Sequence, residues 1–272
     1  MANPVVKWAG GKRQLLPIIK SKLPEEFNTY YEPFLGGGAL LFDLSPERAI
    51  INDFNSQLIN VYEVIKDNRS GLIEALNELQ EAYNGIPESI KSDFYLEKRN
   101  AFNQYIQQNR LSLESAALFI FLNKTGFNGL YRVNSSGMFN VPSAHKKQIK
   151  LYDNDNLFEV SRILNRCEIF NMDFEKVLIG AKENDFVFFD SPYYDTFDTY
   201  QAGGFTIDDH KRLADVFNTL TNKGVKCMLT NNDCIFIKEL YKDYNVEVID
   251  VKRMINCKGN ARTGKEVIIT NY

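Results

Sequence analysis

The sequence predicts an α/β fold in which a parallel sheet, covered by helices on both faces, is interrupted by one long insertion. Short β-rich or apolar runs alternate with stretches of helical periodicity, as is typical of parallel sheets. Several of these runs are apolar throughout, which is expected for strands buried on both faces. A long helical stretch separates two early strand candidates from five later ones.

The strand candidates lie at residues 29–34, 49–53, 168–172, 185–189, 225–230, 245–251 and 266–270. The clearest contains Phe186–Phe189, four consecutive apolar residues between two aspartates, which indicates a buried central strand. Apolar residues recur at three- and four-residue spacing in the interval 56–122, so this interval is predicted to be helical. Another helix is expected at 208–220, opened by Asp208 and Asp209.

Composition excludes several classes of protein. The chain has 272 residues, 44% hydrophobic and 25% charged, which are ordinary values for a globular protein. Apolar runs such as 116–122 are far shorter than the ~20 residues of a membrane-spanning helix, and no signal peptide is visible. Four cysteines without CxxC spacing and only two histidines argue against a zinc site or disulfides. We therefore expect a cytoplasmic protein with no metal and no membrane contact.

Charge is unevenly distributed along the chain. The net charge is −3, yet three stretches carry lysines and arginines without any acid: residues 7–22, 124–150 and 251–265. Such clustering favours a localised surface for a polyanion. Three solvated surface loops would give the same pattern, and charge alone does not separate the two readings.

The turns after the first two strand candidates favour a nucleoside ligand, because ligands of open α/β sheets bind beyond the carboxyl ends of strands. Phe34-Leu35 leads into Gly36-Gly37-Gly38, where glycines permit close approach to the backbone. The spacing differs from the GxGxxG dinucleotide fingerprint, which disfavours a nicotinamide enzyme. Asp53 ends the next strand, where a carboxylate can accept both ribose hydroxyls. A plain turn and a helix cap are the competing interpretations.

The central strand candidate ends in Asp190-Ser191-Pro192-Tyr193. The Asp190 carboxylate and the Ser191 carbonyl are neighbouring acceptors without a donor, which suits an exocyclic amino group. The ring of Tyr193 can stack on a planar base. At the N-terminus, the single tryptophan, Trp8, lies between Lys7 and a Gly-Gly-Lys sequence, which favours a ligand wall over a core anchor.

The second basic stretch contains a predicted β-hairpin whose turn is Ser135-Ser136-Gly137. Aromatic, amide and arginine side chains flank this turn. A two-stranded ribbon of this kind fits the major groove of DNA, where arginine pairs bidentately with guanine.

In this order and spacing the segments resemble the Dam-type DNA adenine-N6 methyltransferases over nearly the whole chain. The segments are WAGGK (8–12), PFLGGGA (33–39), NDFN (52–55), NGLYRVNSSGMFNVP (128–142) and DSPY (190–193). The resemblance implies a Rossmann-like S-adenosylmethionine-dependent methyltransferase sheet with an inserted, mainly helical target-recognition domain that carries the hairpin. The catalytic domain then comprises residues 1–56 and 146–272, and the insertion comprises 57–145.

The resemblance also implies an activity: methyl transfer from S-adenosylmethionine to the amino group of a flipped adenine in double-stranded DNA, within GATC. It assigns catalysis to Asp190, Ser191, Pro192 and Tyr193. It assigns cofactor binding to Trp8, Lys12, Phe34, Gly36, Gly38, Asp53, Asp173, Phe174 and Asp190. It assigns DNA binding to Lys7, Lys124, Phe127, Asn128, Leu130, Arg132, Asn134 and Pro142, with Leu130 or Phe127 as a wedge and Arg132 reading guanine. Protein partners, and whether the role lies in restriction–modification, repair or regulation, stay open.

Two positions depart from the family pattern. Ser191 replaces the first proline of DPPY; it keeps the main-chain carbonyl but is less rigid. Ser143-Ala144-His145 replaces a segment where relatives commonly carry glycine and arginine, so the outer bases of the target are less certain to be GATC. The alternatives are a catalytically impaired DNA-binding relative, or an amino methyltransferase acting on cytosine, RNA adenine or a glutamine amide.

Overall fold

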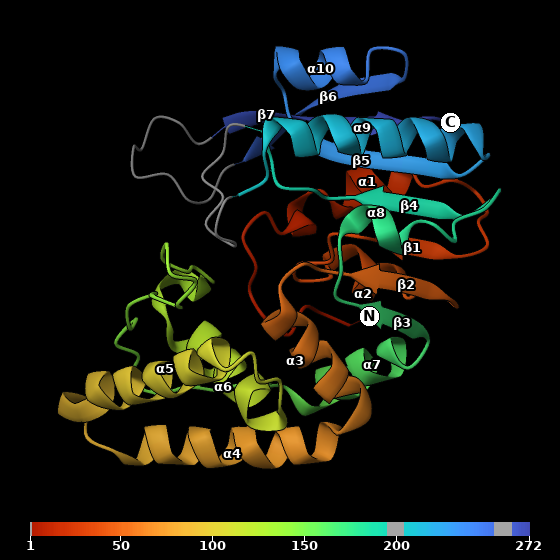
Figure 1. Cartoon of the computed structure of the whole chain (residues 1–272). Coiled ribbons are helices and arrows are strands. Elements are labelled where there is room, and N and C mark those ends of the chain that lie inside the picture. Colours follow the sequence, from red (N-terminus) through yellow and green to blue (C-terminus); the bar gives the residue numbers. More distant parts are fainter. Residues whose placement is uncertain (1, 195–203, 253–262) are drawn as a thin grey trace.

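The computed structural model describes residues 2–194, 204–252 and 263–272, and contains a seven-stranded sheet (Figure 1). The strand order is β3-β2-β1-β4-β5-β7-β6. The α/β prediction with an interrupted sheet is confirmed, and every strand candidate coincides with a strand to within a few residues. The strands are β1 (Tyr30–Glu32), β2 (Ala49–Asn52), β3 (Cys167–Phe170), β4 (Phe186–Phe189), β5 (Lys226–Asn232), β6 (Asn245–Lys252) and β7 (Thr263–Thr270).

The expectation of a purely parallel sheet is wrong for one strand. β3, β2, β1, β4 and β5 pair in parallel, whereas β7 runs antiparallel to both β5 and β6. Only ten residues separate β6 from β7. A parallel crossover needs about a dozen or more residues and usually a helix, so two adjacent strands with this short connection pair antiparallel.

The central strand β4 divides the core into two faces. Phe186 and Phe188 point into one apolar cluster, and Val187 and Phe189 point into the other, as the two-residue period of a strand requires. Helices on the first face are α1 (Leu16–Ser21), α2 (Ala39–Leu44) and α7 (Asn154–Leu164). Helices on the second face are α8 (Phe174–Val177), α9 (Ile207–Asn222) and α10 (Ile235–Leu240).

Helices α3 (Ser56–Asp67), α4 (Arg69–Gly85), α5 (Lys91–Gln107) and α6 (Leu113–Thr125) follow β2, confirming the predicted helical interval. Figure 1 shows α4, α5 and α6 stacked to one side of the sheet, with α3 between them and the strands. Helix α6 is buried on nearly all sides and is therefore apolar all round. Among the described residues, no helix is both long and apolar enough to cross a membrane.

The insertion and the sheet share one hydrophobic core. The cluster on the first face of the sheet contains Phe42 and Phe188, and it continues without a break through Tyr62 of α3 to Phe119 and Phe121 of α6. Helix α3 packs against both α6 and α7, so it belongs to both parts of the chain. The domain limits at 57 and 145 stay a prediction.

We expect Phe121→Ala to lower the free energy of unfolding by about 3–5 kcal/mol, because its fully buried ring packs against Tyr83, Phe94 and Tyr95. Chemical denaturation measures this change. Ile179→Ala is the control: that side chain is 74% exposed, so its removal should change stability by no more than about 0.5 kcal/mol. Since the core is shared, helical circular dichroism and tryptophan fluorescence should report one transition; separate transitions would contradict it.

Candidate active site

The carboxylate of Asp190 lies where β4 ends and is paired with a buried lysine. The ammonium of Lys12 is 2.6 Å from Asp190 Oδ1 and donates to the Gly10 carbonyl oxygen at 2.6 Å. Lys12 is only 5% exposed, and its Nζ also lies 4.7 Å from the centre of the Tyr193 ring. A buried cation needs such partners to offset the loss of water. The N-terminal segment and the DSPY segment are therefore joined at the mouth of the sheet.

Polar residues at the end of the neighbouring strand β5 form hydrogen bonds with the DSPY segment. Thr230, fully buried, donates from Oγ1 to Asp190 Oδ1 at 2.9 Å. The Asn231 amide nitrogen lies 3.5 Å from Ser191 Oγ, and Asn231 Oδ1 accepts from the Tyr194 backbone nitrogen at 3.0 Å. The hydroxyl that serine brings in place of proline thus has a buried partner, and Ser191 is itself only 2% exposed.

Two further contacts fix the tyrosines that follow. Asn232 Nδ2 donates to the Tyr194 carbonyl oxygen at 2.6 Å. The hydroxyl of Tyr193 donates to Glu266 Oε2 of β7 at 2.7 Å, and burial raises the pKa of this phenol well above its ordinary value. Tyr193, the ring expected from the sequence to stack on a base, is therefore fixed through its hydroxyl, and its ring lies beside Lys12.

The glycine-rich turn is shaped by Trp8 and Phe42 as well as by any ligand. Gly36 and Gly38 have positive φ angles of 50° and 68°, a region that side chains other than glycine rarely adopt. A Cβ on Gly36 would lie 2.7 Å from Trp8 Cδ1, and one on Gly38 would lie 2.7 Å from Phe42 Cε2. In this structure the two glycines allow the rings of Trp8 and Phe42 to pack closely against the backbone of the turn.

Trp8 has a structural role that links distant segments. Its ring stacks on Tyr131 with centroids 5.4 Å apart, and Tyr131 stacks on Phe119 of α6 at 5.2 Å. Trp8 is only half-buried and lies against the glycine-rich turn. The core-anchor interpretation of Trp8 therefore describes part of its environment, and the ligand-wall interpretation stays a prediction.

Asp53 lies beside the glycine-rich turn, as predicted from its position at the end of a strand. Its Oδ2 accepts from the Gly36 backbone nitrogen at 2.8 Å and its Oδ1 accepts from the Asn55 backbone nitrogen at 2.9 Å. Burial raises the pKa of Asp53 to about 6, against these hydrogen bonds. The helix-cap interpretation is wrong, because the cap of α3 is Asn55, which accepts from Leu58. Each carboxylate oxygen keeps a second lone pair for a hydroxyl.

Aromatic rings line the next part of the edge. Phe34 and Phe174 lie 5.2 Å apart, and both contact Phe205. Asp173 serves as the N-cap of α8, with Oδ1 accepting from the Glu175 backbone nitrogen, while Oδ2 accepts from Arg212 at 2.9 Å. Asp173 thus already has two partners in the protein, and Arg212 also covers the ring of Phe174, 4.6 Å from its centre.

Asn123 joins the N-terminal segment to the recognition segment. Its side chain accepts from the Lys7 backbone nitrogen at 2.8 Å and donates to the carbonyl oxygens of Lys7 and Gly129, each at 2.9 Å. Asn123 is buried, and a Cβ on Gly129 would lie 2.6 Å from Lys7 Cδ. Lys7 is consequently held against the recognition segment with its side chain exposed.

The recognition segment presents the side chains expected to wedge into DNA. Phe127 is 52% exposed, Asn128 is exposed at a φ of 56°, and Leu130 is half-buried. Asparagine tolerates this left-handed conformation better than most residues. Pro142 is exposed, and its carbonyl oxygen accepts from the Phe127 backbone nitrogen at 2.9 Å. The recognition segment therefore presents the exposed ring of Phe127 next to the exposed amide of Asn128.

The predicted hairpin is present in short form. Val133 and Phe139 form one antiparallel bridge. The turn is closed by Asn134, whose Oδ1 accepts from the backbone nitrogens of Ser136 and Met138 at 3.0 Å each. Asn134 therefore has a turn-closing role in addition to the expected contact with DNA. The exposed Arg132 donates from Nε to Asn140 Oδ1 at 2.7 Å, which positions its guanidinium beside the turn.

Sequence reasoning missed several residues of the site. Thr230, Asn231 and Asn232 end β5 with polar side chains after an apolar run, so the rule applied to the first two strands would have found them. Glu32 is the last residue of β1, so the same rule would have found it. Asn123 gave no such signal, because it lies within a helix and only packing brings it to the site.

Glu32 is a buried carboxyl group near Asp190 and Asp53. Tyr30 donates from its hydroxyl to Glu32 Oε2 at 2.8 Å. Burial, helped by the charge of Asp190 and opposed by the Tyr30 hydrogen bond, raises the pKa of Glu32 to about 8. The group is therefore mostly protonated at neutral pH.

Comparisons with known proteins identify the family of the chain. The chain matches the family described as D12 class N6 adenine-specific DNA methyltransferase over residues 8–255. It is 42% identical over 279 residues to the type II methyltransferase M1.LlaDCHI of Lactococcus lactis subsp. cremoris, covering 99% of this chain and 95% of that protein. It is 40% identical over 287 residues to M.MjaIII of Methanocaldococcus jannaschii, covering 99% of both. The DNA adenine methylase of Escherichia coli (strain K12) is 28% identical over 272 residues, covering 98% and 94%.

We expect Glu32→Gln to flatten the dependence of stability on pH. The folded-state pKa of about 8 exceeds the ordinary value of 4.5, so the folded protein binds an extra proton between these values. The free energy of unfolding of the natural protein should therefore fall as pH rises through this range, and that of the glutamine variant should fall less. Urea denaturation at pH 5 and pH 9 measures both slopes. Equal slopes would show that Glu32 does not titrate in this range.

Proposed function

Because the chain belongs to the D12 class of N6 adenine-specific DNA methyltransferases, we propose that it transfers a methyl group from S-adenosylmethionine to the amino nitrogen of an adenine flipped out of duplex DNA. The observation that carries the proposal is the fixed carboxylate of Asp190 at the end of β4, beside the main chain of Ser191. Both acceptors lie at the sheet edge that also carries Asp53 and the glycine-rich turn.

The residues at this edge fit S-adenosylmethionine. The Asp53 carboxylate suits the ribose hydroxyls, and the half-buried ring of Phe34, packed on the buried Phe174, suits the adenine. Phe54, which is 67% exposed beside Asp53, adds an apolar side chain at the same edge. Gly36 and Gly38 let the turn pack closely against Trp8 and Phe42, which places the half-buried Trp8 ring beside the turn. When bound, this donor supplies an electrophilic methyl group on a sulfonium sulfur.

Asp190 and Ser191 prepare the amino group. The adenine amino nitrogen is a poor nucleophile because its lone pair is delocalised into the ring. Acceptance of its two hydrogens by the Asp190 carboxylate and the Ser191 carbonyl favours a pyramidal nitrogen with an available lone pair. Positive charge develops on the nitrogen as it gains the methyl group, and the same acceptors stabilise that charge. The extra proton leaves after transfer.

Lys12 and Thr230 keep the carboxylate in place for this role. Both occupy Asp190 Oδ1, which directs the other oxygen toward the target. Orientation of this kind accounts for a large part of the acceleration in group-transfer enzymes. Duplex adenine is inaccessible within the stack, so the base swings out and stacks on an aromatic ring, for which Tyr193 is the candidate.

The recognition segment supports duplex DNA as the substrate. Arg132 at the hairpin is placed to read a guanine, Phe127 or Leu130 to wedge between base pairs, and Asn128 to fill the vacated space. We propose GATC as the target on the family pattern. Cytosine, RNA adenine and protein glutamine present the same amino geometry. A substrate of these kinds would leave the hairpin and its side chains without an explanation.

The surroundings of Ser191 support an active enzyme rather than an impaired DNA-binding relative, although the residue departs from DPPY. The buried hydroxyl contact with Asn231 supplies part of the rigidity that proline provides in DPPY. The carbonyl needed for the amino group belongs to the main chain and is the same in both residues.

We expect Asp190→Ala to reduce methyl incorporation into a GATC duplex by at least about 100-fold, the scale of losing one transition-state hydrogen-bonding group. Transfer of labelled methyl groups, followed by nucleoside analysis, gives the rate and identifies the product. Ser191→Pro is the matched control and should keep or raise the rate. If the natural protein transfers no label to the DNA, the chain is an impaired DNA-binding relative. If Asp190→Ala methylates at the same rate as the natural protein, Asp190 is not a catalytic residue.

We expect Arg132→Ala to relax one guanine position of the target at a cost of about 1–3 kcal/mol in discrimination. Methylation of a random-sequence duplex pool, read base by base, measures the preference at every position. Equal weakening on all sequences would instead identify Arg132 as a phosphate contact. A preferred sequence other than GATC in the natural protein would correct the proposed target.

A further inference from the structure

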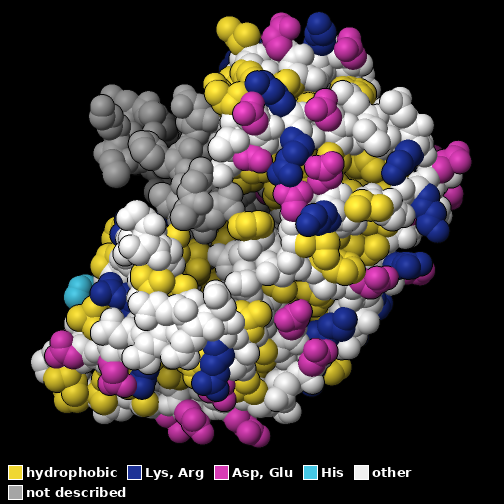
Figure 2. Space-filling view, in the orientation of Figure 1, with side chains coloured by type: hydrophobic (Ala, Val, Ile, Leu, Met, Phe, Trp, Pro, Cys, Tyr) yellow, Lys and Arg dark blue, Asp and Glu magenta, His cyan; other side chains and the backbone are white. Residues whose placement is uncertain are grey.

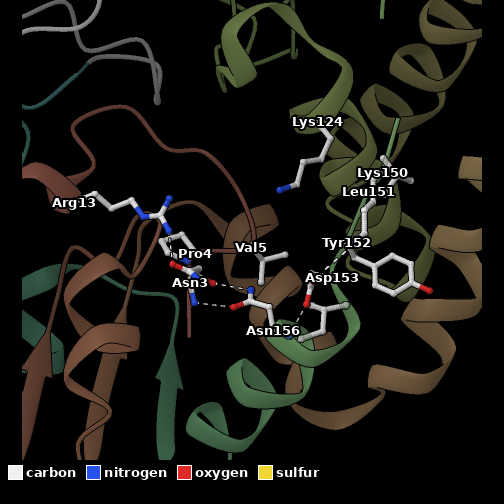
Figure 3. Close-up of a pocket in the computed structure, with 11 residues that line it drawn as sticks. Asn3, Pro4, Val5, Arg13, Lys124, Lys150, Leu151, Tyr152, Asp153 and Asn156 are labelled. Atoms are coloured by element: carbon white, nitrogen blue, oxygen red, sulfur yellow. Dashed lines mark hydrogen bonds and ion pairs between the residues drawn. The ribbon is translucent and has the colours of Figure 1, made fainter. Parts of the chain in front are cut away.

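A basic groove lies between the N-terminal segment, the end of α6 and the start of α7. Its volume is about 590 Å³. Figure 3 shows Arg13 and Lys124 extending into this space above Pro4 and Val5. Lys150 lines the side next to α7. No activity described above uses Arg13 or Lys150.

The groove concentrates positive charge. The pKa of Lys124 is lowered by burial and then by the charges of Lys7, Lys146 and Arg13, so these cations repel one another. Within the described part of the chain, Lys124 and Arg13 form no ion pair with a carboxylate. The one acid in the lining, Asp153, accepts from the Asn156 backbone nitrogen and lies 3.4 Å from Lys150. By contrast, Figure 2 shows basic and acidic side chains interspersed over the face that it presents.

Two residues that line the groove directly follow residues of the candidate site in the chain. Lys12 and Arg13 are adjacent in sequence, but Lys12 is buried against Asp190 while Arg13 is exposed and contacts Asn3. On the other side, Lys124 directly follows Asn123, which holds Lys7 to the recognition segment. Arg13 and Lys124 are therefore tied through their chain neighbours to the ion pair of Lys12 and Asp190 and to the recognition segment. Residues 253–262, which carry most of the third basic stretch, lie outside the described residues.

We propose that this groove binds the sugar-phosphate backbone of the same DNA duplex, with Arg13, Lys124 and Lys150 each meeting a phosphate. The proposal rests on the proposed function and adds a contact surface to it. The mutual repulsion of Arg13 and Lys124, which have no carboxylate partner among the described residues, is relieved by an anion, and a DNA backbone supplies several phosphates in a row. Lys150 is paired with Asp153 only at the surface, so a phosphate can compete for it. Phosphate contacts position a duplex without reading its sequence.

The test is the salt dependence of DNA binding. Fluorescence anisotropy with a GATC duplex and with a scrambled duplex of equal length gives Kd at several salt concentrations. Each lost phosphate contact lowers the slope of log Kd against log salt by about 0.9, so the variant R13Q/K124Q/K150Q should lower it by roughly 2–3 on both duplexes. The double variant R13Q/K150Q, with both changes at exposed positions, should lower it by roughly 2 and keeps the test available if the triple variant misfolds.

The matched control is K182Q/K223Q/K242Q, which removes three exposed charges that do not line the groove. A change in slope no larger than that of the control, or a loss confined to the GATC duplex, would overturn the proposal. Methylation by the natural protein is measured on the same duplex. Lowered slopes without methylation would refute the proposed function and leave the groove as a DNA site; methylation with unchanged slopes would refute the groove alone.

Discussion

The buried pair of Lys12 and Asp190 is the interaction on which the site depends. A lysine ammonium with only 5% exposure is stable there because a carboxylate lies 2.6 Å away and a carbonyl oxygen accepts from it. The pair holds the N-terminal segment across the carboxyl ends of the strands. Trp8 is then placed on the glycine-rich turn, Lys7 reaches Asn123, and Arg13 faces outward. One ion pair thus connects the segments to which we assign catalysis, cofactor binding and DNA recognition.

The strand next to the catalytic segment explains how a sequence can depart from DPPY. Thr230, Asn231 and Asn232 contact three successive parts of that segment: the carboxylate, the serine hydroxyl and the backbone of Tyr194. Because Thr230 and Asn231 are buried, their hydrogen bonds are costly to lose. Rigidity that proline supplies through its ring is supplied here in part by side chains of the neighbouring strand.

Much of the fold and part of the site were predictable from local pattern. The solid apolar run at Phe186–Phe189, the glycine-rich turn and the acids after the strands are short signals, and each is where it was expected. The antiparallel β7 was missed because an apolar strand reads alike in either direction. Asn123 and Arg13 were missed because their roles arise from contacts with residues distant in sequence.

The sequence by itself determined the elements, the order of the motifs and the family, since periodicity, turns and strand ends are properties of neighbouring residues. Only the tertiary structure decided which charges are paired and which remain available. Lys12 and Arg13 are adjacent basic residues, and nothing local distinguishes them. One is buried against Asp190 and the other is exposed in a groove, because burial and partner charge depend on the packing of segments that lie far apart in the chain.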